Sequence, residues 1–275
     1  MDSDLDPGLA ALHALGGFFV LRTVPDPDPD VNANPAPDAN PAPDPAPAGV
    51  GSGAGPRRLP TLAEGYAGVA SDASPDPLTS RVTIVGERLG TREPRVAASI
   101  AQQGLAARLW SAALGCAVLY GRLPDLDPRL LRWDALAAAP DDLWLTGTRP
   151  LPGDAATLAG TVVHGHLEPL TAALRARYGV ATGLLWGNAA SALAATAREL
   201  SRWARVHGRT DVAARTRVLA GELFAHPLLD GTGARTGTAF RRRSCCLYYR
   251  VPGGGLCGDC CFTRPPRSSP GAASG

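Results

Sequence analysis

Five cysteine residues lie close together near the C-terminal end of this 275-residue sequence. They are Cys245, Cys246, Cys257, Cys260 and Cys261, and the first four form a CC-x10-C-x2-C array. The N-terminus is acidic where a secretory leader needs positive charge, so we do not expect export by that route. Away from oxidising compartments, clustered thiols more often hold a metal than form structural disulfides. The array is therefore a candidate metal centre.

The residues between the cysteines favour closure of the array on one point. Leu247–Val251 have strand-forming side chains, and Pro252–Gly255 have the composition of a turn. The chain can therefore leave Cys246, reverse, and bring Cys257 back beside it. Only two residues separate Cys257 from Cys260, a spacing that lets two thiolates converge. The intervening Gly258 permits a close approach, and amide N–H groups there can bond to sulfur.

Four thiolates suit either zinc or an iron–sulfur cluster. Zinc ribbons usually draw on two C-x2-C pairs, whereas here one pair is replaced by the adjacent Cys245 and Cys246. Neighbouring residues do not readily wrap one small tetrahedral ion. A two-iron cluster relaxes that constraint, because its thiolates are divided between two metal atoms. The spacing alone leaves zinc and [2Fe–2S] both open.

The cysteine array lies in a basic segment. Residues 231–275 contain seven Arg and a single acidic residue, Asp259. The arginines nearest to the cysteines are Arg241, Arg242, Arg243 and Arg250. Positive charge there should stabilise a reduced, more negative cluster and can attract an acidic donor or an anionic complex. The alternative is a solvated basic tail. The net charge of the whole chain is only +2, which does not by itself indicate nucleic-acid binding.

Other reactive residues have simpler interpretations. We expect Cys116 to be a small buried residue, Cys261 to be an inert neighbour of the array, and His164 and His166 to be structural rather than metal ligands. The glycines from Gly231 to Gly237 follow a helix and lack the spacing of a nucleotide-binding loop. Since no flavin or nicotinamide motif is visible, electrons are expected from a separate protein.

Short strands early and helices late predict an α+β fold with a mainly helical second half. Residues 8–23 indicate a short helix and then a strand from Gly17 to Thr23. A further strand is expected at 80–85, and either a strand or a buried turn at 118–120 and at 143–145. Helices are expected over 94–115, 168–178, 189–206 and 211–224, the last with Thr210 as its cap and a stop at Pro227.

Composition divides the chain into four parts. Residues 1–24 are the N-terminal helix and strand of the main domain. Residues 25–58, with nine Pro between 25 and 48, are expected to be a disordered insertion. Residues 59–237 continue the main domain, and residues 238–275 form a small metal-binding module with a disordered tail. No apolar run is long enough to predict a transmembrane segment.

The segment Arg242-Arg243-Ser244-Cys245-Cys246-Leu247-Tyr248-Tyr249, followed by Cys257-Gly258-Asp259-Cys260, resembles the C-terminal module of FhuF-type ferric-siderophore reductases. Residues 185–191 are similar to the helical region of that family, less specifically. The resemblance covers roughly residues 60–262, and the insertion at 25–58 departs from the family pattern. It implies that Cys245, Cys246, Cys257 and Cys260 bind one [2Fe–2S] cluster.

The same resemblance implies an enzyme that reduces siderophore-bound Fe(III) to Fe(II). It implies a cytoplasmic location, in some cases with peripheral association at the inner face of the membrane. The expected partners are a ferric siderophore as substrate and a separate protein as electron donor. Two alternatives stay open: a non-catalytic [2Fe–2S] protein, acting as electron carrier or iron sensor, and a zinc-stapled interaction module.

Overall fold

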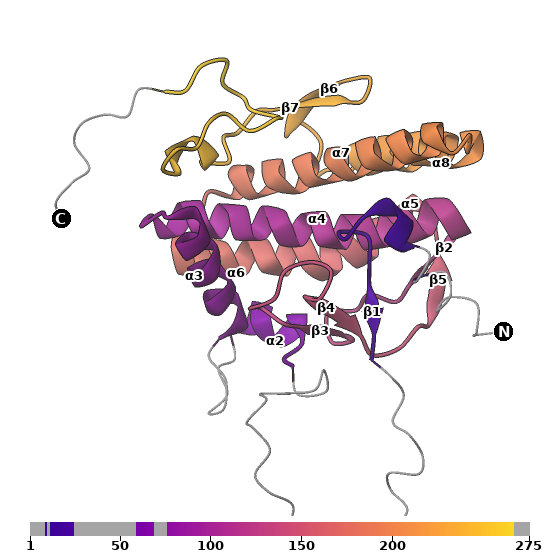
Figure 1. The fold of residues 1–275 in the computed structure, drawn as a ribbon, viewed down its shortest axis with the longest axis horizontal. Helices are drawn as coiled ribbons and strands as arrows, with labels where there is room; N and C mark the ends of the chain where they lie inside the picture. The colour runs from indigo at the N-terminus through magenta and orange to yellow at the C-terminus, as the bar shows by residue number, and fades with distance from the viewer. Residues whose placement is uncertain (1–8, 10–11, 25–58, 69–75, 267–275) are drawn as a thin grey trace, which may run out of the picture.

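The computed structural model describes residue 9 and residues 12–24, 59–68 and 76–266. Long helices stack in layers with a small three-stranded sheet on one side, and the cysteine-rich segment covers the opposite side of the helices (Figure 1). The predicted α+β class is confirmed. The predicted insertion at 25–58 lies outside the described residues, and the division into four parts stays a prediction.

The α-helices are α2 (Leu62–Ala67), α3 (Pro77–Leu89), α4 (Pro94–Tyr120), α5 (Ala155–Leu158), α6 (Glu168–Tyr178), α7 (Thr182–Val206) and α8 (Thr210–Phe224). Three further helical segments are the 3-10 turns η1 (Leu12–Leu15) and η5 (Tyr248–Arg250) and the π-helix η4 (Ala159–Leu167). The helices predicted over 168–178 and 211–224 are confirmed within one residue. Those predicted to start at 94 and 189 are also present, but α4 ends later and α7 begins earlier than predicted.

The strands are all short, and they form three separate sheets. Strand β4 (Leu143–Leu145) pairs in parallel with β1 (Arg22–Thr23) and antiparallel with β3 (Leu131–Trp133). Strand β2 (Arg122–Pro124) pairs with β5 (Pro150–Pro152). The hairpin formed by β6 (Gly233–Thr236) and β7 (Ala239–Arg242) leads into the cysteine array. This hairpin crosses the predicted boundary at residue 238.

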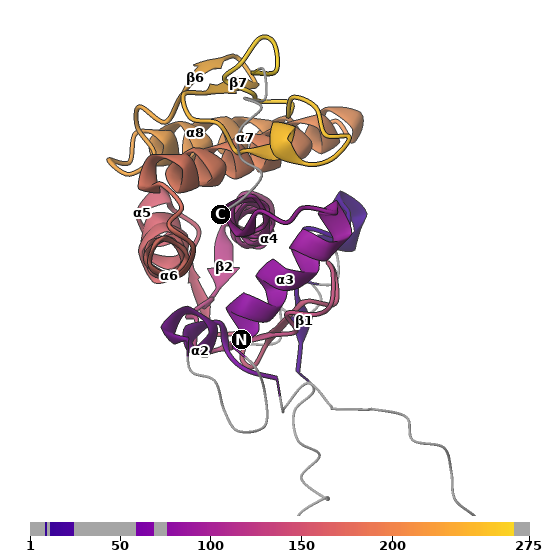
Figure 2. The same ribbon diagram turned by 90° about the vertical axis from the view of Figure 1, so that its left-hand side faces the viewer.

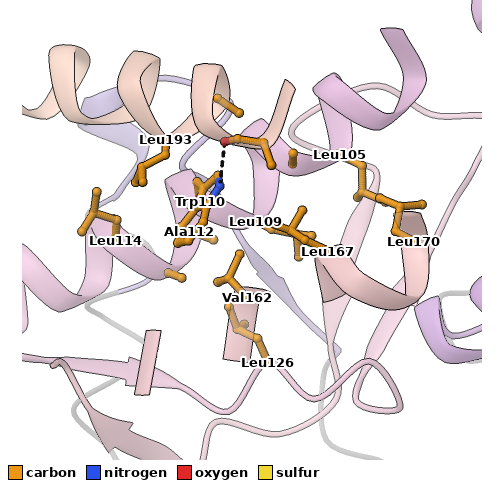
Figure 3. Packing of buried hydrophobic residues seen from close by; sticks show 14 of the residues in the cluster. Leu105, Leu109, Trp110, Ala112, Leu114, Leu126, Val162, Leu167, Leu170 and Leu193 are labelled. Atoms are coloured by element: carbon orange, nitrogen blue, oxygen red, sulfur yellow. Dashed lines mark hydrogen bonds between the residues drawn. The ribbon is translucent and has the colours of Figure 1, made fainter. Parts of the chain in front are cut away.

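Helix α4 is the centre of the molecule, since 19 of its 27 residues are buried. A helix that is apolar on all sides must be covered on all sides. Figure 2 shows α3 and α6 on two of its sides and α7 above it, between α4 and the cysteine-rich segment. Figure 3 shows Trp110 of α4 among packed leucines, with its indole N–H donating a 3.1 Å hydrogen bond to the Ala189 carbonyl of α7.

A buried arginine ties the N-terminal segment to α4. The Nε of Arg108 lies 2.8 Å from Oδ1 of Asp142, and both side chains are 2% exposed. The same guanidinium donates to the carbonyls of Phe18 and Val20, the latter at 2.8 Å. Because these hydrogen bonds occupy the Phe18 and Val20 carbonyls, only Arg22 and Thr23 form a strand, rather than the whole segment from Gly17 to Thr23.

The strand predicted over 80–85 and the strand or buried turn predicted over 118–120 are both helical. Residues 80–85 lie within α3, because Asp76 caps the helix, Pro77 occupies its first turn and Gly90 ends it with φ 62°. Alternating apolar residues over six positions also fit one face of a helix, so the caps were the better signal. Residues 118–120 are the last turn of α4, which stops at the left-handed Gly121. At 143–145, where either a strand or a buried turn is expected, the structure has strand β4.

Candidate functional site

The cysteine array is carried by the β6–β7 hairpin and lies over α7 (Figures 1 and 2). The hairpin can close because Gly233 has no side chain: a Cβ there would come within 2.3 Å of the Phe240 ring. Gly237 supplies the positive φ of 60° at the turn. The Gly-rich segment from 231 to 237 thus leads into a hairpin strand, Gly233–Thr236, and begins its turn.

A chain of buried polar contacts connects the array to both central helices. Arg242, at the end of β7, donates to the side-chain carbonyl of Asn188 and to the Gly187 carbonyl of α7. The Asn188 amide donates to the Ser99 carbonyl of α4 at 2.8 Å. The Ser99 hydroxyl in turn donates to the backbone carbonyl of Cys246 at 2.8 Å. Cys246 is therefore positioned by residues from α4 and α7.

Asp259 fixes the other half of the array. Its Oδ2 accepts a 2.7 Å hydrogen bond from the Ser191 hydroxyl, and its Oδ1 lies 3.2 Å from Nη1 of Arg198. Its backbone carbonyl accepts from the Arg242 amide at 3.0 Å. The turn from Cys257 to Cys260, which contains Asp259, is closed by the Cys260 amide donating to the Cys257 carbonyl at 3.1 Å. The turn is thus held on α7.

The thiols of the array come together in two groups. The sulfur atoms of Cys246 and Cys257 lie 3.5 Å apart, within hydrogen-bond distance. Cys261 interacts with both Cys245 and Cys260. The charges of Cys246 and Cys260 also raise the pKa of Cys245. The structure therefore pairs Cys246 with Cys257, and it places Cys261 near Cys245 and Cys260 rather than apart from them.

Backbone amides point at two of the sulfur atoms. The Leu247 amide donates to Sγ of Cys245 at 3.3 Å, and the Phe262 amide donates to Sγ of Cys260 at 3.4 Å. Leu247 has a φ of 68°, the left-handed conformation that side chains rarely adopt. Because of this turn and the 3-10 helix Tyr248–Arg250, the strand predicted over 247–251 is wrong. The reversal predicted after it, at Pro252–Gly255, is present as a turn.

The thiols differ in acidity. The pKa of Cys246 is lowered to about 6, chiefly because the Cys257 thiol hydrogen-bonds to its thiolate, and Arg242 acts in the same direction. The pKa of Cys257 is raised by the same contact, and Arg242 opposes that rise. Desolvation raises the pKa of Cys245 to about 11. One thiolate is thus already favoured inside the array, next to a buried positive charge.

The buried Arg242 guanidinium has one N–H donor that is not engaged by any described residue. Its side chain is 2% exposed, and its Nη1 atom has no hydrogen-bond partner among the described residues. A buried guanidinium with a free N–H is suited to a further anionic acceptor. Sulfur-rich donors, amides directed at sulfur and a buried cation together fit an anionic iron–sulfur group.

The other predicted site residues have separate roles. Arg250 pairs with Glu93 at 2.8 Å, and Arg241 donates to the Cys261 carbonyl. Cys116 is fully buried in the core, as predicted, and desolvation raises the pKa of its thiol to about 12. His166 is buried between the Tyr66 hydroxyl and the Leu126 carbonyl, which confirms a structural role. His164 faces Glu168 and His226 instead.

Sequence reasoning missed Ser99, Asn188, Ser191 and the role of Asp259. Ser99 lies 147 positions from Cys246, Ser191 lies 68 positions from Asp259, and Asn188 lies 54 positions from Arg242. Asp259 carried a local signal, since it is the one acidic residue of the basic segment and lies between two cysteines, and Asn188 and Ser191 fall within the 185–191 stretch that resembles the family.

Among the described residues, no set of three or more His, Cys, Asp or Glu side chains is arranged to hold a single metal ion. In a [2Fe–2S] cluster each iron needs only two protein thiolates. None of the helices that the structure describes has the length and apolar character of a membrane-spanning segment.

Comparison with known proteins identifies the array. Residues 242–262 match the family model described as the FhuF 2Fe-2S C-terminal domain. The match covers every cysteine of the array and agrees with the resemblance seen in the sequence. It indicates a [2Fe–2S] cluster as the cofactor. No curated protein matches the chain.

Proposed function

We propose that this protein, whose C-terminal segment carries a FhuF-type 2Fe-2S domain, is a ferric-siderophore reductase. In this proposal Cys245, Cys246, Cys257 and Cys260 are the four ligands of the cluster. The observation that carries the proposal is the donor set: paired thiols, two amides directed at sulfur and the buried Arg242, held on α4 and α7. When bound, the cluster supplies a one-electron redox couple.

The reaction needs little chemistry from the side chains. Siderophore-bound Fe(III) accepts one electron and becomes Fe(II), and the electron comes from a separate donor protein. Hard oxygen ligands hold Fe(III) better than Fe(II), so the reduced metal is released. No proton transfer or covalent intermediate is required. The activity fits a cytoplasmic location, where imported ferric siderophores would deliver their iron.

The residues of the chain then have three tasks. Arg242 favours the thiolate forms and stabilises added negative charge, which favours the reduced state. Ser99 and Asn188 hold the Cys246 backbone, and Asp259 holds the turn between Cys257 and Cys260. Cys245, Cys257 and Cys260 are only partly buried, so a substrate can approach the sulfur-rich surface.

A single-turnover assay tests the proposal. The full chain is purified without oxygen, its cluster is identified by UV–visible and EPR spectroscopy, and it is reduced with a limited amount of dithionite. It is then mixed with a ferric trihydroxamate and a ferric tricatecholate in the presence of an Fe(II)-specific chromophore. We expect one Fe(II) per reduced cluster with at least one of these substrates. Cys116→Ser is the matched control and should behave as the wild type.

Two results would contradict the proposal. A cluster that is reduced and reoxidised without releasing Fe(II) from any chelate would indicate an electron carrier or sensor. A colourless protein with stoichiometric zinc would indicate a zinc-stapled module.

A further inference from the structure

A cavity of about 300 Å³ lies beside the cysteine array, between α7, α8 and the β6–β7 hairpin. Pockets that bind small molecules begin at about this size. Its apolar wall includes Phe224 of α8 and Phe240 of β7, whose ring centroids are 5.6 Å apart. Figures 1 and 2 show the hairpin lying over α7 and α8 where this cavity is formed.

The charge of the cavity is one-sided. Arg198, Arg217 and Arg235 line it, and the lining contains no Asp or Glu. Arg198 is paired with Asp259, whereas Arg217 and Arg235 have no carboxylate partner within the described part of the chain. The Arg235 guanidinium lies 4.5 Å from the centre of the Phe224 ring, so the aromatic wall orients it. Two free guanidinium groups thus border an apolar floor.

The cavity is connected directly to the array. Strand β7 contributes Ala239 and Phe240 to the lining and ends at Arg242, three positions before Cys245. Arg198 lines the cavity. It also forms an ion pair with Asp259, which lies between Cys257 and Cys260. A molecule held in this cavity is therefore separated from the turn between Cys257 and Cys260 by the Arg198–Asp259 pair.

We propose that this cavity binds an anionic ferric chelate of the catecholate class, an inference that rests on the proposed function. Three catecholates around Fe(III) leave the complex with three negative charges, whereas three hydroxamates leave it neutral. The aromatic rings of a catecholate pack against Phe224 and Phe240, and its charged oxygens meet Arg217 and Arg235. The site thus selects its substrate by charge as well as by aromatic packing.

Binding is measured with Ga(III) complexes, which have the shape and charge of the ferric complexes but are not reduced. The cluster-loaded full chain is titrated by calorimetry with Ga(III)–tricatecholate and with Ga(III)–trihydroxamate. We expect the tricatecholate to bind at least tenfold more tightly and to weaken as salt is raised. Arg217→Gln and Arg235→Gln should each weaken it about tenfold and leave the trihydroxamate unaffected.

Arg95→Gln is the matched control. Arg95 lines a different cavity of about 180 Å³, together with Leu247 and Arg250, on another side of the array. It should leave binding unchanged. Loss of binding in Arg95→Gln, equal binding of the two complexes, or no effect of the Arg217 and Arg235 substitutions would each overturn the proposal. Unchanged cluster absorbance and melting temperature verify that each variant is folded, and the exposed Arg217 serves if Arg235→Gln is unstable.

The two proposals fail separately. If Ga(III)–tricatecholate binds as expected but no ferric chelate yields Fe(II), the cavity stands and the reductase function is wrong. If a ferric chelate yields Fe(II) but Ga(III)–tricatecholate does not bind, the reductase function stands and this cavity is not its catecholate site.

Discussion

The Ser191 hydroxyl of α7 donates a 2.7 Å hydrogen bond to Oδ2 of Asp259, in the turn between Cys257 and Cys260. The same carboxylate pairs with Arg198, about two turns further along α7. Both groups are on a long, well-packed helix, so the turn is fixed before any metal is considered. Asp259 is therefore the residue through which the helical domain positions two of the proposed ligands.

Substitution of Asp259 tests this positioning. Asp259→Asn keeps the shape but loses the ionic contact with Arg198, and it should lower the free energy of unfolding by about 1–2 kcal/mol. We expect the cluster absorbance to be lost faster in the presence of an iron chelator. Asp230→Asn, at an exposed carboxylate outside the array, is the control. Equal rates of loss in the two variants would show that the Asp259 contacts do not support the cluster.

The ligand assignment predicts different outcomes for the cysteines. Cys246→Ser and Cys257→Ser should abolish the visible charge-transfer absorbance and the reductase activity together. Cys116→Ser should leave both intact, since Cys116 is buried in the core. Cys261→Ser should also leave both largely intact, even though Cys261 interacts with Cys245 and Cys260. Loss of the cluster in Cys261→Ser, with retention in Cys260→Ser, would exchange the roles of these two residues.

Burial of His166 predicts acid sensitivity. Desolvation lowers its pKa from 6.5 to about 4, so the unfolded chain binds a proton more readily than the folded chain. The stabilising contribution is complete above pH 6.5 and is lost as the pH falls towards 4, to a limit of about 3 kcal/mol. Urea denaturation at several pH values measures this.

The non-titrating His166→Gln variant isolates the effect. It should be less stable at pH 7, because the Tyr66 hydroxyl loses its partner. Between pH 6.5 and 4, however, its free energy of unfolding should change less than that of the wild type. Parallel curves for the two proteins would exclude His166 as the source of the pH dependence.

The Arg108–Asp142 pair should contribute strongly to stability. Arg108→Met leaves a carboxylate buried without a counter-charge and leaves the Phe18 and Val20 carbonyls unbonded. Removal of one partner of a buried pair costs about 3–5 kcal/mol. Chemical denaturation should show a loss of this size, whereas Arg202→Met, in an exposed pair with Glu199, should change little. A small loss in Arg108→Met would contradict the assigned role.

Deletion of residues 27–54 should be tolerated. The chain on either side is tied to neighbouring strands: the Val24 amide donates to the Leu145 carbonyl, and Arg132 donates to the Leu59 carbonyl. Both flanking residues are thus held on the sheet that contains β3 and β4, and closure entropy depends only weakly on the length of the connecting segment. The shortened protein should keep its melting temperature within a few degrees and retain its cluster. An insoluble product without a cluster would contradict this.

Much of the site could be predicted from the sequence, because the spacing of the cysteines is local information. The contacts that hold them could not: the Ser99 hydroxyl meets the Cys246 carbonyl across 147 positions, and nothing in a local pattern pairs them. The same limit applies to the cavity, since its arginines come from α7, α8 and β6.

The errors in the fold have a related cause. Over 80–85 the alternation of side chains favoured a strand, but the cap at Asp76 and the stop at Gly90 determine a helix. Over 247–251 the side chains favour a strand, but the left-handed Leu247 directs its amide to Cys245 and starts a 3-10 turn. In both places the decisive residue lay at the edge of the segment or outside it.

The hydrogen bonds from Arg108 attach the N-terminal segment, residues 12–24, to the main body of the protein as a distinct unit. The segment contacts side chains and a strand edge of the main body. The Arg108 guanidinium donates hydrogen bonds to its backbone carbonyls, and strand β4 pairs with its residues Arg22 and Thr23. A truncated protein that begins at residue 59 should therefore present a vacant groove. A synthetic peptide of residues 9–24, added in trans, should bind there and restore the lost stability by complementation.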